Sequence, residues 1–150
     1  MKLLVPPPLV ALTGAAIMWA VSNYLGGWHV AFPLQAIVAY ALMAIGLALD
    51  GVSVFAFVKA KTTVTPLAPE KTSRLVSGGL YRFTRNPMYL GMLLILTGIA
   101  VLLGAPANIL VLAGFVAYIT HFQIKPEEER LEAMFGDEYR AYKRSVRRWL

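Results

Sequence analysis

The stretch MYLGMLLILTGIAVLLGAPANILVLAGFVAYITHFQI, residues 88–124, decides the fold of this chain. It consists of two uncharged apolar segments, 88–103 and 107–124, which are separated only by Gly104–Pro106. A helix needs about 20 residues to cross roughly 30 Å of hydrocarbon, and it satisfies its own backbone hydrogen bonds there. Because the connection is so short, the stretch predicts a tight antiparallel hairpin of two short membrane-spanning helices.

Two further apolar segments, 9–25 and 34–58, precede the hairpin. The chain has 150 residues, of which 58% are hydrophobic and only 15% charged. Its mean hydropathy of +0.62 is too high for a soluble domain of this size. Three consecutive prolines, Pro6–Pro8, interrupt the apolar core that a cleavable signal peptide needs, so we expect the first segment to be retained. The sequence therefore predicts one all-α integral membrane domain, residues 1–150, with four transmembrane helices.

The basic residues are confined to three parts of the chain. The connections between spans one and two and between spans three and four contain no Lys or Arg. All 14 basic residues lie in the N-terminus, the second connection or the tail: Lys2; Lys59, Lys61, Lys71, Arg74, Arg82, Arg85; Lys125, Arg130, Arg140, Lys143, Arg144, Arg147, Arg148. By the positive-inside rule these parts, and both termini, are cytoplasmic. The net charge of +6 reflects this orientation and an attraction to anionic lipids, and without a soluble basic domain it does not indicate nucleic-acid binding.

The tail, residues 125–150, has the periodicity of an amphipathic cytoplasmic helix. Its apolar positions recur every three or four residues and form one stripe: Leu131, Phe135, Tyr139, Tyr142, Val146 and Trp149. Gly136 is expected to break or bend this helix. Pro126 suits a first helical turn, where the helix dipole also favours the acids Glu127–Glu129.

A compact polar signature, YRFTRNPMYLGM at residues 81–92, stands directly before the third span. Asn86 is a favoured N-cap residue and Pro87 a favoured first helical residue, so together they predict a helix start. Arg82 and Arg85, beside the amides of that helix start, form a surface that can receive an anion. The alternative interpretation is that the arginines bind lipid phosphates and the flanking tyrosines form an interfacial belt.

The hairpin should return the end of the fourth span to the start of the third. Glu127 and Glu128 are therefore expected close to Asn86 and Tyr89. Carboxylates on one side, with arginines and free amides on the other, suit a zwitterionic ligand that carries both an amino and a carboxylate group.

Three polar residues within the spans, Asp50, Tyr118 and His121, are candidates for lining a substrate pocket. An acid within a span is expensive and usually faces protein or water. Asp50 therefore indicates a polar contact at the inner wall of the pocket, a salt bridge to Lys59 or a cap on a broken helix. Tyr118 and His121 are one helical turn apart and are expected to line the same cavity, unless His121 instead makes a polar contact between helices.

The sequence predicts no metal site, because it has no cysteine and its two histidines, His29 and His121, lie far apart. Gly46 and Gly91, each taken with the residue four positions further on, do not make a convincing small-residue packing motif. The oligomeric state therefore stays open.

Two motifs in the C-terminal half resemble those of a known family. GGLYRFTRNPMYLG has the form G-x-Y-R-x-x-R-[HN]-P-x-Y-x-G, and EEERLEAMFGDEYRAYKRSVRRW has the form E-E-x-x-L-x-x-x-F-G-x-x-Y-x-x-Y. The matching residues are Gly79, Tyr81, Arg82, Arg85, Asn86, Pro87, Tyr89 and Gly91, then Glu127, Glu128, Leu131, Phe135, Gly136, Tyr139 and Tyr142. The pair resembles the signature of integral-membrane methyltransferases that include isoprenylcysteine carboxyl methyltransferase and the phosphatidylethanolamine N-methyltransferases.

This resemblance implies that S-adenosylmethionine binds between the last two spans and the tail, with its methyl group facing a tunnel open to the bilayer, and that S-adenosylhomocysteine is the product. It implies catalytic roles for Arg85, orienting an anionic group of the acceptor, and for Glu128, facing the cofactor. The implied cofactor-binding residues are Gly79, Leu80, Tyr81, Asn86, Pro87, Tyr89, Glu127 and Glu128, completed by backbone amides near Leu80, Tyr81 and Asn86. Eukaryotic members often carry histidine at the position of Asn86, and asparagine cannot titrate in its place.

The resemblance leaves the acceptor open, since an isoprenylcysteine carboxylate and a phospholipid amine both fit a tunnel that faces the bilayer. A four-span chain resembles the shorter bacterial members, which implies a location in the bacterial inner membrane. Two other classes remain as alternatives. A small exporter of the multidrug type would place its coupling carboxylate in the first span, where this chain has none, and only Asp50 supports that class. A nicotinamide-dependent membrane reductase has a comparable architecture and needs no dinucleotide fingerprint.

Overall fold

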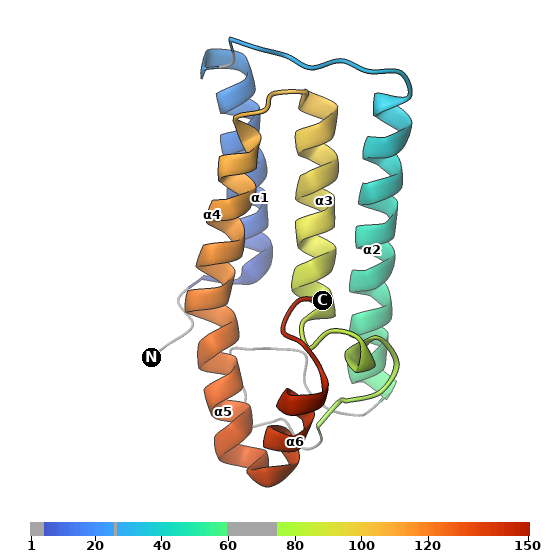
Figure 1. Cartoon of the computed structure of the whole chain (residues 1–150), viewed down its shortest axis with the longest axis vertical. Helices are drawn as coiled ribbons and strands as arrows, with labels where there is room; N and C mark the ends of the chain where they lie inside the picture. Colours follow the sequence, from blue (N-terminus) through green and yellow to red (C-terminus); the bar gives the residue numbers. More distant parts are fainter. Residues whose placement is uncertain (1–4, 26, 60–74) are drawn as a thin grey trace.

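The structure is a computed structural model that describes residues 5–25, 27–59 and 75–150, and these residues form helices and loops without a strand (Figure 1). The elements are α1 (Pro7–Ala20), η1 (Val21–Leu25), α2 (Gln35–Lys59), η3 (Gly79–Arg82), α3 (Pro87–Leu103), α4 (Asn108–Ile119), η4 (Thr120–Ile124), α5 (Lys125–Phe135) and α6 (Asp137–Ser145). The predicted all-α class is therefore confirmed. Four of the basic residues assigned to the cytoplasm, Lys2, Lys61, Lys71 and Arg74, lie outside the described residues.

The apolar segments of the sequence become the long helices of the bundle. In the part of the chain that the structure describes, two helices are long and apolar enough to cross a membrane, α2 and the continuous run Asn108–Phe135, while α3 is a shorter apolar helix. In Figure 1, α3 stands between α2 and α4, and α1 lies against α3 and α4. The number of helices that cross a membrane stays a prediction.

The α3–α4 hairpin forms as its short connection predicts, with the two helices side by side and running in opposite directions (Figure 1). Gly104 ends α3 with a φ of 66°, in the left-handed region that favours glycine. Its carbonyl accepts the Val30 N–H at 2.7 Å. A side chain here would collide, because a Cβ would lie 2.6 Å from the Val30 carbonyl oxygen. This contact joins the two connections at one end of the bundle.

The α2–α3 interface is a backbone-to-backbone contact between glycines, which the sequence interpretation missed. A Cβ on Gly46 would lie 2.5 Å from the Gly91 carbonyl oxygen, and a Cβ on Gly98 would lie 2.6 Å from the Ala39 carbonyl oxygen. Small residues at such positions allow helix backbones to approach closely. The signal was the seven-residue spacing of Gly91 and Gly98, two turns on one helix face, rather than a four-residue spacing.

On its other sides, α3 packs through large apolar side chains. The buried cluster between α1, α3 and α4 consists of Met18, Tyr89, Met92, Leu96, Phe115, Ile119 and Ile124. Within the same layer the Asn108 side-chain amide donates to the Ser22 hydroxyl at 3.1 Å, with both residues buried. The cluster extends to Tyr89 and Ile124, so it supports the polar end of the bundle directly.

The start of the tail follows its prediction in part. Pro126, Glu127 and Glu128 lie in the first turn of α5 as predicted, but α5 continues the helix from Asn108 without a break. A proline inside a helix clashes with the carbonyl four residues back. The widened π turn at Thr120–Ile124, in which the Lys125 N–H bonds to the Thr120 carbonyl, directly precedes this proline and relieves that clash. The glutamates that follow are therefore not at a free helix N-terminus.

The remainder of the tail follows the predicted stripe. Gly136, with a φ of 53°, separates α5 from α6, so the expected break is confirmed. The stripe residues, from Leu131 to Trp149, are each buried or half-buried. They form the inner face of two short helices and a final extended stretch rather than of one helix.

Candidate functional site

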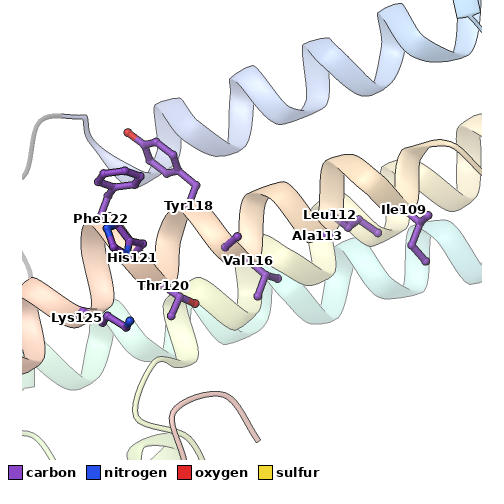
Figure 2. Close-up of a pocket in the computed structure, with 10 residues that line it drawn as sticks. Ile109, Leu112, Ala113, Val116, Tyr118, Thr120, His121, Phe122 and Lys125 are labelled. Carbon is purple, nitrogen blue, oxygen red and sulfur yellow. The ribbon is translucent and has the colours of Figure 1, made fainter.

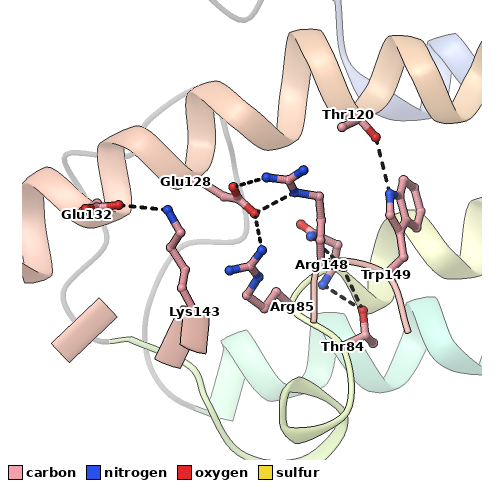
Figure 3. Close-up of polar contacts among 9 residues, drawn as sticks. Thr84, Arg85, Thr120, Glu128, Glu132, Lys143, Arg148 and Trp149 are labelled. Carbon is pink, nitrogen blue, oxygen red and sulfur yellow. Dashed lines mark hydrogen bonds and ion pairs between the residues drawn. The ribbon is translucent and has the colours of Figure 1, made fainter. Parts of the chain in front are cut away.

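The candidate site lies where the start of α3, the helix α5 and the last residues of the chain meet (Figure 3). Its centre is Glu128, which is only 6% exposed. Arg85 Nη2 lies 3.0 Å from Glu128 Oε1. Arg148 donates to the same carboxylate twice, from Nε to Oε1 at 3.0 Å and from Nη2 to Oε2 at 2.8 Å. A buried carboxylate is stable only with such charged partners.

A second contact joins the same two helices. The Tyr89 hydroxyl donates to Glu127 Oε2 at 3.0 Å. Both glutamates of the tail thus meet residues at the start of α3, as the hairpin predicts, although Arg85 and Glu128 are 43 positions apart along the chain. The two arginines of the signature lie in different environments: Arg85 points inward to Glu128, while Arg82 is exposed.

The turn before α3 is tied to the end of the chain rather than capped by its own side chain. Pro87 occupies the first turn of α3, and Asn86 stands at the N-cap position as predicted, but its side chain makes no capping bond. Asn86 Nδ2 instead donates to the Arg148 carbonyl at 2.9 Å. Its backbone N–H donates to the Thr84 hydroxyl at 3.1 Å. The prediction of a side-chain cap was therefore wrong: the Asn86 amide donates from Nδ2 to the end of the chain, and its side chain accepts no bond from the first turn of α3.

The last five residues, 146–150, which we call the C-terminal segment, were missed as part of the site. The Arg85 N–H donates to the Arg147 carbonyl at 2.9 Å, and the Thr84 hydroxyl donates to the Arg148 carbonyl at 3.3 Å. Trp149 Nε1 donates to the Thr120 hydroxyl at 3.3 Å. The sequence interpretation counted the two arginines only as orienting charges. The signal in the sequence was that Arg147 and Arg148 directly precede Trp149, the last residue of the apolar stripe, which indicates that this segment packs against the protein.

The 3₁₀ turn η3 forms the floor of the site around Tyr81, which is buried. Tyr142 donates its hydroxyl to the Tyr81 carbonyl at 2.6 Å, and the Phe57 ring of α2 meets the Tyr81 ring edge-on at 5.5 Å. Gly79 opens the turn with a φ of 59°, and Leu80, which follows it, is half-buried. The turn is thus held from α2 and α6 at once.

The phenols around the site are neutral. Burial raises the pKa of Tyr142 to about 12, with the positive charge of Arg85 opposing the shift. Burial likewise raises the pKa of Tyr81 and of Tyr139 above its ordinary value, reinforced by the charge of Glu127 at Tyr81 and of Glu128 at Tyr139. The contact with Glu128 raises the pKa of the Arg148 guanidinium, so this arginine stays charged.

Backbone amides near Leu80, Tyr81 and Asn86 were expected to bind the cofactor, but two of them, those of Tyr81 and Asn86, are already hydrogen-bonded. The Tyr81 N–H donates to the Gly78 carbonyl at 3.1 Å, inside the turn. The Asn86 N–H is taken by Thr84. These two amides close the turn locally, so they are not free donors for a ligand.

The described groove holds Tyr118 and His121 without Asp50, and the pocket-lining role of all three stays a prediction. Asp50 of α2 faces Gly91 of α3, whereas Tyr118 lies on α4 and His121 on η4. Figure 2 shows these two with Lys125 along an open groove of about 880 Å³. His121 is exposed, its ring lies edge-on to Phe122 at 4.7 Å, and among the described residues it forms no hydrogen bond to another helix.

Asp50 also does not form the salt bridge to Lys59 that one interpretation of the sequence proposed. Among the described residues its Oδ1 is buried without a hydrogen-bond partner, and no ion pair to Lys59 forms there. α2 continues unbroken past Asp50 to Lys59, so the residue does not cap a broken helix either. The polar-contact interpretation is the one that stays a prediction.

The fold and the site define the class of the protein: a helical membrane-type bundle with a buried, charged site at the end that carries its described basic residues. The family model for phospholipid methyltransferase matches residues 34–138, more than half of the chain. The chain therefore belongs to the phospholipid methyltransferase family, a family of membrane methyltransferases that generally use S-adenosylmethionine. This membership confirms the resemblance drawn from the two motifs.

The matched region runs from the start of α2 into α6, so it contains both motif arginines and both glutamates but not the C-terminal segment. The chain is also similar to an uncharacterized protein of Haemophilus influenzae, with 51% identity over 63 residues, which cover 42% of this chain and 100% of that protein. No solved structure matches the chain.

Proposed function

We propose that this chain is an S-adenosylmethionine-dependent methyltransferase that acts on a lipophilic acceptor delivered by the membrane, such as an isoprenylcysteine carboxylate or a phospholipid amine. The observation that carries the proposal is the 3.0 Å ion pair between Arg85 and Glu128. It joins the two motifs of the family at one buried point. Structural ion pairs also occur far from active sites, but this one gathers further ionisable residues around it.

The residues present fit the amino-acid part of the cofactor, which carries an ammonium and a carboxylate. Glu127 and Glu128 provide carboxylates for the ammonium, and Arg85 provides a guanidinium for a carboxylate. We assign Glu128 to the cofactor, with Glu127 and Tyr89 on its amino-acid part or ribose. The turn around the cofactor would be formed by Gly79, Leu80, Tyr81, Asn86 and Pro87.

When bound, the cofactor supplies a methyl group on a positively charged sulfur. The protein then has to align the acceptor and exclude water, which requires little covalent chemistry. Arg85 orients an anionic group of the acceptor, and the neutral phenols of Tyr81 and Tyr142 keep the floor of the site free of competing charge. A carboxylate acceptor needs no general base, whereas an ammonium acceptor must first lose a proton. Asn86 cannot accept that proton, so an ammonium acceptor would need another base.

We further propose four spans, namely α1 with η1, α2, α3, and α4 with η4. The described basic residues lie at one end of this bundle, which we assign to the cytoplasmic face of a bacterial inner membrane. The site and both termini are then cytoplasmic. Asp50, between α2 and α3, and the pair Tyr118 and His121, along the groove of α4 and η4, then become contacts on two separate sides of α3. Nothing in the family match favours an exporter or a reductase.

Calorimetric binding of S-adenosylhomocysteine to detergent-purified protein tests the proposal. We expect micromolar binding by the wild type, and binding at least about tenfold weaker in Arg85→Ala and Glu128→Ala, because each loses a contact to a charged group. Since Glu128→Ala leaves two arginines unpaired, Glu128→Gln is measured beside it. Arg144→Ala, an exposed arginine of the tail, is the matched control and should bind as the wild type does. Absence of binding to well-folded wild type, or binding of NADPH instead, would contradict the proposal.

A further inference from the structure

The charged cluster at the centre of the site is not balanced. Two guanidinium groups, of Arg85 and Arg148, share the single carboxylate of Glu128. The side chains of Arg85 and Glu128 are only 9% and 8% exposed, while that of Arg148 is 34% exposed. Two positive charges therefore contact one carboxylate where two of the three side chains are buried, with Glu127 as the nearby second acid, and burying charges in this way is expensive. Such a cluster attracts an anion.

The two arginines contact Glu128 in different ways. Arg148 holds both carboxylate oxygens in a two-point contact, from Nε and from Nη2. Arg85 reaches only Oε1, through Nη2. Its Nε is buried and has no hydrogen-bond partner among the described residues. A guanidinium offers five N–H donors in a fixed plane, so Arg85 retains donors that Glu128 does not use.

We infer that Arg148 is a positioning residue of the site: by occupying both oxygens of Glu128 it keeps Arg85 from doing so, and thereby leaves Arg85 free to bind an oxyanion of a ligand. The inference rests on the proposed function. The oxyanion has two possible sources with one chemistry, the carboxylate of the cofactor's amino-acid part or the phosphate of a phospholipid acceptor. Arg148 lies beyond the residues that the family model matches.

The physical reason is competition for one acceptor. Without the Arg148 side chain, the second oxygen of Glu128 loses its donor, and burying an ionised oxygen without a partner is costly. The adjacent Arg85 guanidinium is the nearest group that can replace it, and a two-point contact is the geometry that arginine and carboxylate prefer. Arg85 would then turn its remaining donors onto Glu128 and away from the ligand.

The C-terminal segment stays in place when only this side chain is changed. Asn86 and Thr84 both donate to the Arg148 backbone carbonyl. Arg85 donates from its backbone to the Arg147 carbonyl, and Trp149 bonds to Thr120. None of these four bonds uses the Arg148 guanidinium, so a side-chain substitution tests the guanidinium itself.

The test compares Arg148→Gln and Arg148→Lys with Arg147→Gln, an equal change of charge at the neighbouring exposed arginine. Each protein is titrated calorimetrically with S-adenosylhomocysteine and with 5′-methylthioadenosine, which shares the adenosine part but lacks the amino-acid part, that is, both the carboxylate and the ammonium. For a cofactor source, we expect Arg148→Gln to bind S-adenosylhomocysteine about tenfold more weakly, the usual effect of losing one hydrogen bond to a charged group, and 5′-methylthioadenosine within about twofold of wild type. Arg148→Lys keeps the positive charge but can make only a single contact, so its affinity for S-adenosylhomocysteine should fall between those of the wild type and Arg148→Gln.

A second arm tests the phosphate source, using dioleoyl phosphatidylethanolamine and the phosphate-free dioleoylglycerol in mixed micelles. A wild-type preference for the phospholipid that falls in Arg148→Gln, but not in Arg147→Gln, supports the inference through the acceptor. A merely structural role would weaken both members of each ligand pair in parallel. Unchanged preferences in both arms of Arg148→Gln overturn the inference while leaving the proposed function intact. If the wild type does not bind S-adenosylhomocysteine, the proposed function fails. The lipid arm then tests the role of Arg148 separately.

Discussion

Helix α3 is held by two different kinds of contact. On the side that faces α2, Gly91 and Gly98 let the backbone of α2 approach until carbonyl oxygens meet the helix surface. At the start of α3, Arg85, Asn86 and Tyr89 reach carboxylates and carbonyls that belong to α5 and the C-terminal segment. The glycine contact has no room for an added atom. In the charged contact, removing one charged side chain leaves its partner unpaired. The difference teaches that one helix uses separate residues for two tasks: some pack it rigidly against α2, and others form the charged site.

The largest effect should come from breaking the charged end. Glu128→Ala leaves two arginines without their carboxylate, and removing one partner of a buried ion pair costs about 3–5 kcal/mol. We expect a correspondingly lower midpoint in thermal unfolding of the detergent-solubilised protein. Glu132→Ala is the control, since Glu132 pairs with Lys143 and Arg140 at the surface and should lose far less. Equal losses in both variants would mean that the buried pair does not hold the site.

The glycine interface should be the next most sensitive. Gly91→Ala places a Cβ 2.7 Å from the Gly46 carbonyl oxygen and against the Asp50 carboxylate, and such overpacking costs about 1–3 kcal/mol. The measurement is again thermal unfolding in detergent. Gly51→Ala, also in a long helix but with nothing within 4 Å of its Cβ, is the matched control and should be neutral or slightly stabilising. A stable Gly91→Ala variant would refute the close approach of α2 and α3.

A smaller effect is expected where α6 is fastened to the floor of the site. Tyr142→Phe removes the 2.6 Å hydrogen bond to the Tyr81 carbonyl, and one neutral hydrogen bond contributes about 1 kcal/mol. Unfolding of the variant should show this loss, and S-adenosylhomocysteine binding should weaken slightly because the turn loosens. Tyr40→Phe changes an exposed tyrosine and should behave as the wild type does. An equal response of both variants would separate Tyr142 from the site.

The smallest effect should be a response to acid in α6. The hydrogen bond and charge of Arg140 lower the pKa of Asp137. A lowered folded-state pKa means that the pair's contribution is present above the unfolded-state pKa, about 3.9, and is lost as the pH falls through the folded-state value. Circular dichroism between about pH 5 and pH 3 should therefore show slightly less helix loss for Asp137→Asn than for the wild type, because the variant has already lost the pair. Identical acid curves would show that the pair contributes nothing.

The sequence predicted the elements and the meeting point of the two motifs well. The apolar segments became helices whose bounds differ from the predicted spans by a residue or two, apart from the unbroken run into α5. The approach of Glu127 and Glu128 to the start of α3 followed from the short connection alone. Predictions about individual hydrogen bonds fared worse. The Asn86 cap and the free amide of Tyr81 both failed, because each group found a nearer partner than the one that local pattern suggested.

What the sequence alone determined is what depends on neighbours along the chain: helix length, the tight hairpin and the gathering of charge at one end of the bundle. Those properties follow from periodicity, composition and loop length. Only the tertiary structure decided that Arg148 occupies Glu128, that Gly46 meets Gly91, and that Asp50 and Tyr118 stand on opposite sides of α3. The two contacts join residues 20 and 45 positions apart. Their partners are chosen by distance in the folded bundle, where a few tenths of an ångström decide which donor meets which acceptor.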